Sequence, residues 1–370
     1  MFPIFAGLSA DGSPFGYIFN LLYLLFFLFF MLYGQKLQMW TMLREINGAV
    51  EKLQKYKDDA REVAIKVIKE KGKGKDDPTP RIDQYLEYFT TFPSDLDPAG
   101  IVGKLEHIID VRDRRFKDEI KIIAPEIEET ESSNLEGVLE VALALNYVYR
   151  VVRHFYLLGK KMMSYFVIMQ IQMQLPILMQ EAKAYAGAVN AFAYGQPIGD
   201  GAGAMVAARL MHGKRYREIA KDIVSAQISM DGRKVHVLKA KGPGANIGKY
   251  GDAIQKLIKK HKKATLIMVD AGLKFEGEET GHTIEGVGTA IGGIGIDQFK
   301  IEEIASKFKT PLNAVVIRMS ITESVAPMRK EIVDGVNDAI GKVKRLIKER
   351  TKKGDVAIVV GVGNTVGIGQ

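Results

Sequence analysis

A long apolar stretch near the N-terminus constrains the fold of this chain more than any other feature of its sequence. From Tyr17 to Tyr33 the chain reads YIFNLLYLLFFLFFMLY, and it carries no charge from Gly12 to Gln35. About 20 apolar residues in a helix are enough to cross the hydrocarbon core of a bilayer. A charged side chain at the centre of such a helix would cost about 3 kcal/mol. The stretch therefore predicts one transmembrane helix, at residues 17–35.

A cleaved signal peptide is the alternative explanation of this stretch. Signal peptides begin with basic residues and end at a cleavage site with small residues. Here Asp11 is the only charge before the stretch, and the bulky Tyr33 ends it, which favours a retained helix. Basic residues follow the stretch, namely Lys36, Arg44, Lys52, Lys55 and Lys57. The positive-inside rule therefore predicts a single-pass protein of the cell membrane, with residues 1–16 outside and the body after Lys36 in the cytoplasm.

The next segment, residues 36–72, has a heptad pattern. Its apolar positions are spaced alternately by four and three residues, a period that is typical of coiled coils. These positions are Met39, Leu43, Ile46, Val50, Leu53, Ala60, Ala64 and Val67, with Lys57 as a polar interruption. The pattern predicts a coiled-coil stalk and hence a homo-oligomer. The alternative is an amphipathic helix that packs on its own body or lies on the membrane. A flexible segment rich in Gly and Lys, residues 71–78, ends the helix.

Residues 80–212 read as a mostly helical region. The Ser-Ser-Asn sequence at 132–134 indicates the start of one helix, and a methionine-rich helix is predicted at 162–193. The second helix begins with a long uncharged run, but its glutamines and Pro176 argue against a second membrane span. We expect it to be a buried helix of a bundle or part of an oligomer interface, because methionine packs adaptably.

From residue 213 the pattern changes to alternating strands and helices. Two apolar runs, 224–228 and 235–238, flank Asp231-Gly232, which is a strong signal for a β-hairpin. Further strands are predicted at residues 264–269, 313–317 and 356–360, and helices at 250–261, 301–308 and 327–350. Strands that alternate with helices predict a C-terminal α/β domain over residues 213–370, Rossmann-like, with a parallel or mixed sheet covered on both faces.

Ligands of such domains gather beyond the carboxyl ends of the strands, and four segments are predicted to lie there. The first, residues 241–249, contains Gly242, Gly244, Gly248 and Lys249 between a strand and a helix. Glycines let the backbone approach a ligand, and the free N–H groups of a helix start attract anions. The segment matches neither the Walker A nor the dinucleotide-binding pattern. We interpret it as a phosphate or carboxylate cradle, with a simple tight turn as the alternative.

The second segment begins at Asp270, the end of a predicted strand, and continues with Glu276, Glu278, Glu279 and His282 in a glycine-rich loop. A carboxylate at a strand end often binds a metal ion or a ribose. Carboxylate oxygens suit hard cations such as Mg²⁺, so the candidate metal ligands are Asp270, Glu276 and Glu278. A solvated acidic loop is the alternative.

The other two segments follow the last two predicted core strands. Arg318 can hold an anion and Glu323 can act as a ligand, with helix capping by Ser320 or Thr322 as the ordinary alternative. The last segment, residues 361–370, is glycine-rich and carries no charged side chain. Its candidate ligand-binding residues are Gly361, Gly363 and Asn364. Chain ends usually fray, so such a tail predicts that it is tucked into a site or an interface.

Composition excludes some kinds of chemistry. The chain has no cysteine, which rules out disulfides, thiolate catalysis and thiolate-bound metals, and its six histidines show no ligand spacing. A net charge of +8 suits contact with an anionic membrane surface or with a phosphorylated ligand. The positive charge is dispersed and lacks interleaved aromatic residues, so no nucleic-acid partner is expected.

Four stretches of the chain resemble an archaeal family of membrane-anchored proteins that is catalogued only as a domain of unknown function. They are YFTTFPSDLDPAGIVGKLEHIIDVRDRRF (88–116), GQPIGDGAGAMVA (195–207), DAGLKFEGEETG (270–281) and GVGNTVGIGQ (361–370). The resemblance covers nearly the whole chain. It implies an archaeal protein with an N-terminal membrane helix, and it assigns no activity and no catalytic residue. Gly199-Asp200-Gly201 in the second stretch is either another binding turn or only a loop that bounds a helix.

Two hypotheses for the function follow. The first is a membrane-anchored scaffold or structural protein that faces the cytoplasm and assembles as a homo-oligomer. The transmembrane helix, the heptad pattern and the lack of a complete catalytic motif support it. The second is a membrane-tethered enzyme or sensor that binds a nucleotide or another phosphorylated small molecule, with Mg²⁺, in the α/β domain. The four glycine-rich segments support it. In both hypotheses the lipid bilayer is a partner.

Overall fold

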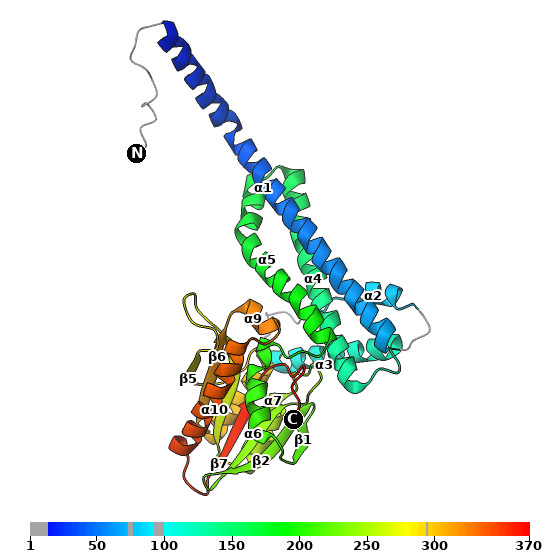
Figure 1. Cartoon of the computed structure of the whole chain (residues 1–370), viewed down its shortest axis with the longest axis vertical. Coiled ribbons are helices and arrows are strands. Elements are labelled where there is room, and N and C mark those ends of the chain that lie inside the picture. The colour runs from blue at the N-terminus through cyan, green and yellow to red at the C-terminus, as the bar shows by residue number, and fades with distance from the viewer. Residues whose placement is uncertain (1–13, 73–76, 92–99, 294) are drawn as a thin grey trace. The chain divides into compact units, whose positions relative to one another are not determined.

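The computed structural model describes residues 14–72, 77–91, 100–293 and 295–370 (Figure 1). The predicted outer segment 1–16 and the predicted linker 71–78 lie partly outside the described residues. The helices are α1 (Pro14–Lys71), α2 (Thr79–Leu86), α3 (Ile101–Ile123), α4 (Glu129–Met162), α5 (Tyr165–Ala193), η1 (Gly199–Gly201), α6 (Ala202–Met211), α7 (Tyr250–Lys260), α8 (Ile296–Phe308), α9 (Ile321–Val325) and α10 (Lys330–Arg350). The strands are β1 (Tyr216–Ala220), β2 (Ile223–Met230), β3 (Arg233–Ala240), β4 (Thr265–Leu273), β5 (Thr283–Val287), β6 (Leu312–Met319) and β7 (Val356–Gly361).

The chain forms two compact units, one of residues 1–55 and 147–179 and the other of residues 56–146 and 180–370. The first unit contains the N-terminal part of α1, the end of α4 and the start of α5. Nearly all large apolar side chains between Tyr17 and Tyr33 are exposed, among them those of Phe26 (67%) and Phe30 (65%). In the described part of the chain, α1 is the one helix that is long and apolar enough to cross a membrane.

The heptad positions of α1 are largely covered within the chain. Ile46 is 1% exposed, and Leu53 and Ala64 are fully buried. A heptad pattern identifies a helix face that packs on other helices, and here those helices belong to the same chain. The structure therefore favours the alternative of a helix that packs on its own body. A homo-oligomer stays a prediction, and it would need a surface other than this one.

The start of α4 differs from the sequence prediction. The helix begins at Glu129, so the predicted start at 132–134 is wrong by about one turn. The Oγ of Ser133 donates to the carbonyl oxygen of Glu129 at 3.1 Å, and Oδ1 of Asn134 accepts from the N–H of Ala245 at 3.0 Å. These hydrogen bonds satisfy polar side chains inside a helix, where they would otherwise favour its end.

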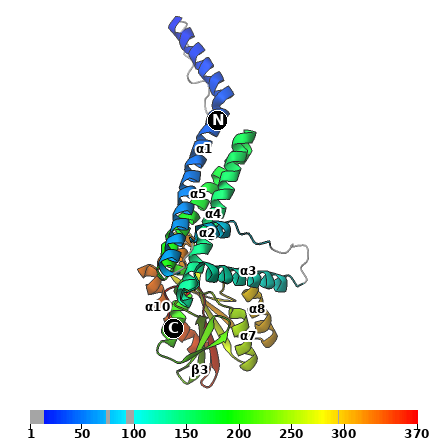
Figure 2. The same cartoon turned by 90° about the vertical axis from the view of Figure 1, so that its right-hand side faces the viewer.

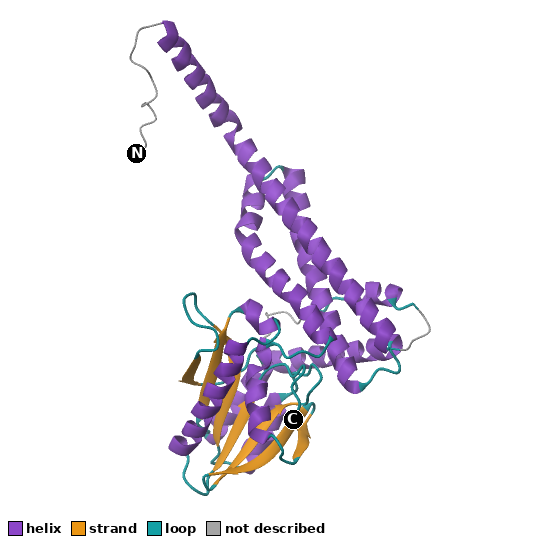
Figure 3. Cartoon of the chain, in the orientation of Figure 1, coloured by secondary structure: helices purple, strands orange, loops and turns teal. Residues whose placement is uncertain are grey.

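A mixed sheet of seven strands forms the centre of the second unit, in the order β1-β2-β3-β7-β4-β6-β5 (Figure 3). The pairs β3–β7, β7–β4 and β4–β6 are parallel, whereas β1–β2, β2–β3 and β5–β6 are antiparallel. The predicted hairpin at Asp231-Gly232 is confirmed, with Met230 paired to Arg233. Its two turn residues have φ of 48° and 75°, the left-handed conformation that a tight hairpin requires.

Helices cover both faces of this sheet (Figure 2). On one face, Val206 of α6 and Val336 of α10 belong to one apolar core with Val269 of β4. On the other face, Ile254 of α7 and Ile301 of α8 belong to a second core with the sheet. The predicted alternation of strands and helices is thus confirmed. α6, which the sequence placed with the helical region 80–212, belongs to the core of the sheet.

Candidate functional site at the carboxyl edge of the sheet

The parallel strands β3, β7, β4 and β6 end at one edge of the sheet, where all four predicted ligand segments lie. The loop 241–249 follows β3, and the tail after Gly361 follows β7. Asp270 and Arg318 lie inside β4 and β6 rather than after them, because both strands run further than predicted. The prediction that these segments lie together at one edge is confirmed. What the edge can bind depends on how the segments contact one another.

The C-terminal tail fills much of this edge. Thr365 is fully buried, and its Oγ1 lies 2.8 Å from the carbonyl oxygen of Gly244 and 3.1 Å from those of Lys241 and Asn246. The N–H of Gly367 donates to the carbonyl oxygen of Pro243 at 2.8 Å. The tail is therefore tucked in, as predicted, and it is hydrogen-bonded to the loop that the sequence indicated as an anion cradle.

Several glycines at this edge serve the close approach of one backbone to another. A Cβ on Gly242 would overlap the carbonyl oxygen of Ile368, and a Cβ on Gly361 would overlap that of Gly203. Gly363 also has a φ of 123°, which side chains rarely allow. Gly244 is less crowded, with Ser133 at 3.0 Å from the position of a Cβ. Contact between chain segments thus accounts for the glycines for which the sequence predicted a ligand.

Two carboxyl groups at this edge, Asp200 and Asp270, have raised pKa values. Asp270 is 8% exposed, and its Oδ1 accepts from the N–H of Ala271 at 2.8 Å. Burial, and then the charge of Asp200, raise the pKa of Asp270 well above its ordinary value. Burial also raises the pKa of Asp200, against the opposing effect of the N–H of Asn364, which donates to Asp200 Oδ2 at 2.8 Å. The pair therefore favours protonation, or a ligand that donates hydrogen bonds or carries positive charge.

Lys239 is a buried cation that the sequence reasoning missed. It is fully buried, and its Nζ donates to the carbonyl oxygen of Ala240 at 2.8 Å and to that of Ile368 at 3.5 Å. Burial lowers the pKa of Lys239 to about 8. Its strand position shares the inward face of Val235 and Val237. The sequence signal was the alternation of Val235, Val237 and Lys239, because every second residue of a strand lies on the same face of the sheet. A lysine on the face of two buried valines is expected to be buried as well.

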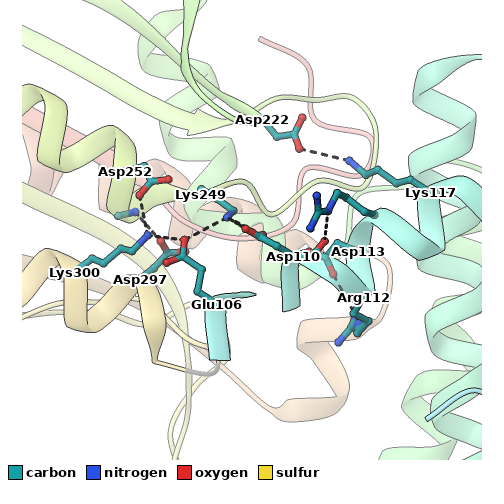
Figure 4. A network of polar contacts seen from close by, with 12 residues as sticks. Glu106, Asp110, Arg112, Asp113, Lys117, Asp222, Lys249, Asp252, Asp297 and Lys300 are labelled. Carbon is teal, nitrogen blue, oxygen red and sulfur yellow. Dashed lines mark hydrogen bonds and ion pairs between the residues drawn. The ribbon is translucent and has the colours of Figure 1, made fainter. Parts of the chain in front are cut away.

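Lys249 is engaged by carboxylates of α3 (Figure 4). Its Nζ lies 2.7 Å from Asp110 and 3.3 Å from Glu106, and Lys300 Nζ lies 2.7 Å from the same Glu106. Burial lowers the pKa of Lys249, but the hydrogen bonds and charges of Asp110 and Glu106 outweigh burial and raise it. The segment with Lys249 was interpreted as a cradle for a phosphate or a carboxylate. Lys249 does bind carboxylates, and they belong to Asp110 and Glu106 of the same chain.

Arg318 holds the loop that follows β4. Its guanidinium donates to the carbonyl oxygen of Leu273, lies 5.3 Å from the ring centre of Phe275 and has its Nε 3.6 Å from Glu278. Glu276 is exposed. Within the described ranges, no group of three or more His, Asp or Glu side chains that could hold a metal ion is found, and a Mg²⁺ site at Asp270, Glu276 and Glu278 stays a prediction.

The segment after Arg318 is a helix cap. Ser320 Oγ accepts from the N–H of Glu323 at 3.2 Å, and Glu323 Oε2 accepts from the N–H of Ser320 at 2.8 Å. This reciprocal arrangement is a capping box. Helix capping, the alternative that the sequence suggested for this segment, is therefore present, and Ser320 is the capping residue. Glu323 also pairs with Arg329 at 2.8 Å.

A further group of carboxyls between α3 and α4 gave no signal in the sequence. Burial raises the pKa of Glu136 to about 7, and it raises the pKa of Asp113 and of Glu140 as well. Arg112 donates a hydrogen bond to Glu140. Residues so far apart along the chain come together through helix packing, which periodicity alone does not specify.

Two family models match the chain and together cover most of it. Residues 20–195 match the N-terminal domain of a protein of unknown function, DUF1512, and residues 198–369 match the DUF1512 C-terminal domain. The chain belongs to the DUF1512 family. No curated protein and no solved structure matches it.

The DUF1512 domain boundary clarifies the site. Asp200, Lys239, Asp270 and the tail all lie in the DUF1512 C-terminal domain, whereas Glu106 and Asp110 lie in the N-terminal domain. The carboxyl-edge pair is therefore a feature of the C-terminal domain alone. The ion pairs of Lys249 join the two DUF1512 domains within one compact unit.

Proposed function

We propose that this DUF1512 protein is anchored in a membrane by the first part of α1 and holds its α/β domain at the membrane surface. The exposed apolar surface of α1 between Tyr17 and Tyr33 is the observation that carries the proposal. Each large apolar side chain gains about 1.5–3 kcal/mol when it leaves water, and patches of this extent usually contact a membrane or another protein. α1 continues without a break to Lys71, which fits an anchor that stays attached to the body.

The basic residues after the apolar stretch support one orientation. Lys36, Arg44 and Lys52 follow it, whereas the segment before it lacks Lys and Arg. The positive-inside rule then gives a single span with the N-terminus outside and the α/β domain in the cytoplasm. A scaffold role is compatible with this arrangement, and assembly of several copies would use a surface other than the covered heptad face of α1.

The experiment for the anchor is a pair of charge substitutions within the span. Leu24→Lys with Phe27→Lys introduces two charges near its centre, each costing about 3 kcal/mol in hydrocarbon. The wild-type chain should stay with the membrane after an alkaline wash, and the double variant should be released. Val287→Lys, at a position that is 90% exposed, is the control and should stay bound. A wild-type chain that is soluble without detergent would contradict the proposal.

A second candidate function, binding of a small ligand at the carboxyl edge, is favoured by the Asp200–Asp270 pair. In Rossmann-like domains a carboxylate beyond a parallel strand binds the ribose hydroxyls of a nucleotide. A hydroxyl or ammonium donor suits this pair better than a bare phosphate does, because carboxylates repel phosphate and Lys249 is already paired with Asp110 and Glu106. We therefore favour a nucleoside-bearing ligand whose sugar contacts Asp270.

Thermal unfolding with added nucleotides and nucleosides tests this second candidate. A ligand that binds only the folded state must raise the melting temperature. The rise should be lost in Asp270→Asn and kept in Asp334→Asn, which changes an exposed carboxylate. A rise that requires Mg²⁺ and survives Asp270→Asn would contradict the assignment.

A further inference from the structure

We infer that the turn between α4 and α5 is a second membrane contact, which binds the headgroup layer of an anionic bilayer. We call residues 160–166 the α4–α5 tip. The inference rests on the proposed anchor, because the tip belongs to the same compact unit as the apolar part of α1. It assigns a lipid partner to a part of the chain for which the sequence favoured a buried helix or an oligomer interface over a second membrane span.

The α4–α5 tip combines exposed apolar and basic side chains. Met162, Met163 and Phe166 are 61%, 59% and 67% exposed. Lys160 and Lys161 precede them and are exposed too. Methionine and phenylalanine with adjacent lysines is the composition of segments that enter the boundary between headgroups and acyl chains. Lysines near such a boundary keep their charge in water while their stems cover apolar surface.

The backbone of the tip supports a role for its apolar side chains. Met163 has a φ of 49°, a left-handed conformation that favours glycine and that a bulky residue adopts at a cost. A turn that served only to connect two helices would be easier to form with glycine at this position. Strain of this kind at an exposed position points to a function for the side chain that is kept there.

The level of the tip along α1 follows from the contact of α5 with α1. Gln172 of α5 donates to Glu45 of α1 at 2.7 Å, and the two helices run in the same direction there (Figure 1). Tyr165, where α5 begins, is seven residues before Gln172, and Gln38 is seven residues before Glu45. Because both helices rise equally per residue, the tip lies near the level of Gln38, just beyond the apolar stretch.

The same level of α1 has the side chains of a membrane boundary. Lys36 Nζ lies 5.6 Å from the centre of the Tyr33 ring, and the Arg44 guanidinium lies 5.8 Å from that of Trp40. Aromatic rings and basic side chains anchor a transmembrane helix where hydrocarbon meets the headgroups. The tip thus continues a surface that already suits lipid, and its two lysines favour anionic over neutral headgroups.

The chain has no cysteine, so a single introduced cysteine carries a unique label. The full chain is placed in phosphatidylcholine vesicles with and without phosphatidylglycerol, with a polarity-sensitive fluorophore at Met163→Cys. Phe27→Cys, inside the span, is the positive control, and Val287→Cys, 90% exposed in the α/β domain, is the negative control. Nitroxide-bearing lipid should quench the label at positions 27 and 163 but not at 287.

Charge reversal then tests the lysines. Lys160→Glu with Lys161→Glu should lower the ratio of lipid-inserted to water-exposed tip by at least about fivefold for each lysine, and phosphatidylglycerol should no longer favour insertion. The matched control reverses another exposed lysine pair, Lys352→Glu with Lys353→Glu, and should change nothing. Dependence of tip insertion on phosphatidylglycerol in the wild type and in the Lys352/Lys353 control, together with its loss in the Lys160/Lys161 variant, would support the inference.

Two results would overturn the inference. In the first, the label at position 163 stays as accessible to aqueous iodide as the label at 287 while the label at 27 is quenched by lipid, so the anchor stands and the tip contact fails. In the second, position 163 is shielded from water but is quenched by labels on other copies and not by lipid, which assigns the tip to a protein interface. Absence of lipid quenching at position 27 would instead contradict the anchor itself.

Discussion

Asp270 is a buried carboxyl group beside a second one, and both conditions penalise its charged form. Burial and Asp200 raise its pKa. A carboxyl whose pKa rises on folding holds its proton more tightly in the folded state, so its contribution to stability is full below pH 4 or so and is lost as the pH rises through the folded pKa. Asp270→Asn should therefore raise the melting temperature at pH 7 and change little at pH 4.

The size of this effect follows from the linkage. Each unit by which folding raises the pKa of Asp270 lowers the free energy of unfolding at neutral pH by about 1.4 kcal/mol. Thermal unfolding of the full chain in detergent at both pH values measures it, with Asp334→Asn as the exposed control. A lower melting temperature of Asp270→Asn at pH 7 would mean that the charged carboxylate is stabilised by a contact that these residues do not provide.

Lys239 has the opposite linkage. Burial lowers its pKa to about 8, so the unfolded chain binds this proton more tightly and stability rises as the pH climbs from about 8 toward 10.5. Lys239→Met keeps the shape and removes the charge, and it should stabilise the protein at pH 7 by about 1–3 kcal/mol. The gain should shrink near pH 10. Unfolding of Lys352→Met, at an exposed lysine, gives the reference, and a loss of stability in Lys239→Met would refute this account.

The C-terminal tail behaves as part of the core. Thr365→Val removes a hydroxyl that lies close to three carbonyl oxygens of the loop 241–249, and this should cost about 1–3 kcal/mol because buried acceptors lose a donor. Thr365→Ser keeps the hydroxyl and should cost less than half as much. Denaturant unfolding compares the two variants, and a larger loss in Thr365→Ser than in Thr365→Val would show that the methyl group, not the hydroxyl, stabilises the tail.

Elements whose residues alternate or repeat along the chain were predictable. The strands β4, β6 and β7 and the helices α7, α8 and α10 were all predicted, because each buries an apolar run or face. The edge strands β1 and β5 were not, since three consecutive residues in each are exposed. Such strands are defined by pairing with a neighbour, which a local pattern does not contain.

The candidate site was predictable only in its position. Sequence reasoning placed the glycine-rich segments at the strand ends but could not tell a ligand cradle from loops that pack on each other. Gly242 and Gly363 illustrate this, since their missing side chains make room for Ile368 and Asp200 of the same chain. The heptad pattern of α1 has the same ambiguity, because a period of 3.5 indicates a helical partner without saying whether it lies in the same chain.

The position of the protein in the membrane depends on where one apolar stretch ends and the basic residues begin. The exposed side chains of residues 17–33 suit hydrocarbon, whereas Lys36 and Arg44 suit the headgroup layer, and the α4–α5 tip lies near the same level. An anchored chain of this kind would present the α/β domain and its carboxyl-edge pair to the cytoplasm.

Labelling of single cysteines with a membrane-impermeant maleimide tests both the membrane span and its orientation. In intact cells Ser9→Cys should be labelled from outside, Phe27→Cys should be protected until detergent is added, and Leu273→Cys should be labelled only after the cells are permeabilised. Labelling of Leu273→Cys in intact cells would contradict the orientation. Labelling of Phe27→Cys from either aqueous side, without detergent, would contradict the membrane span itself.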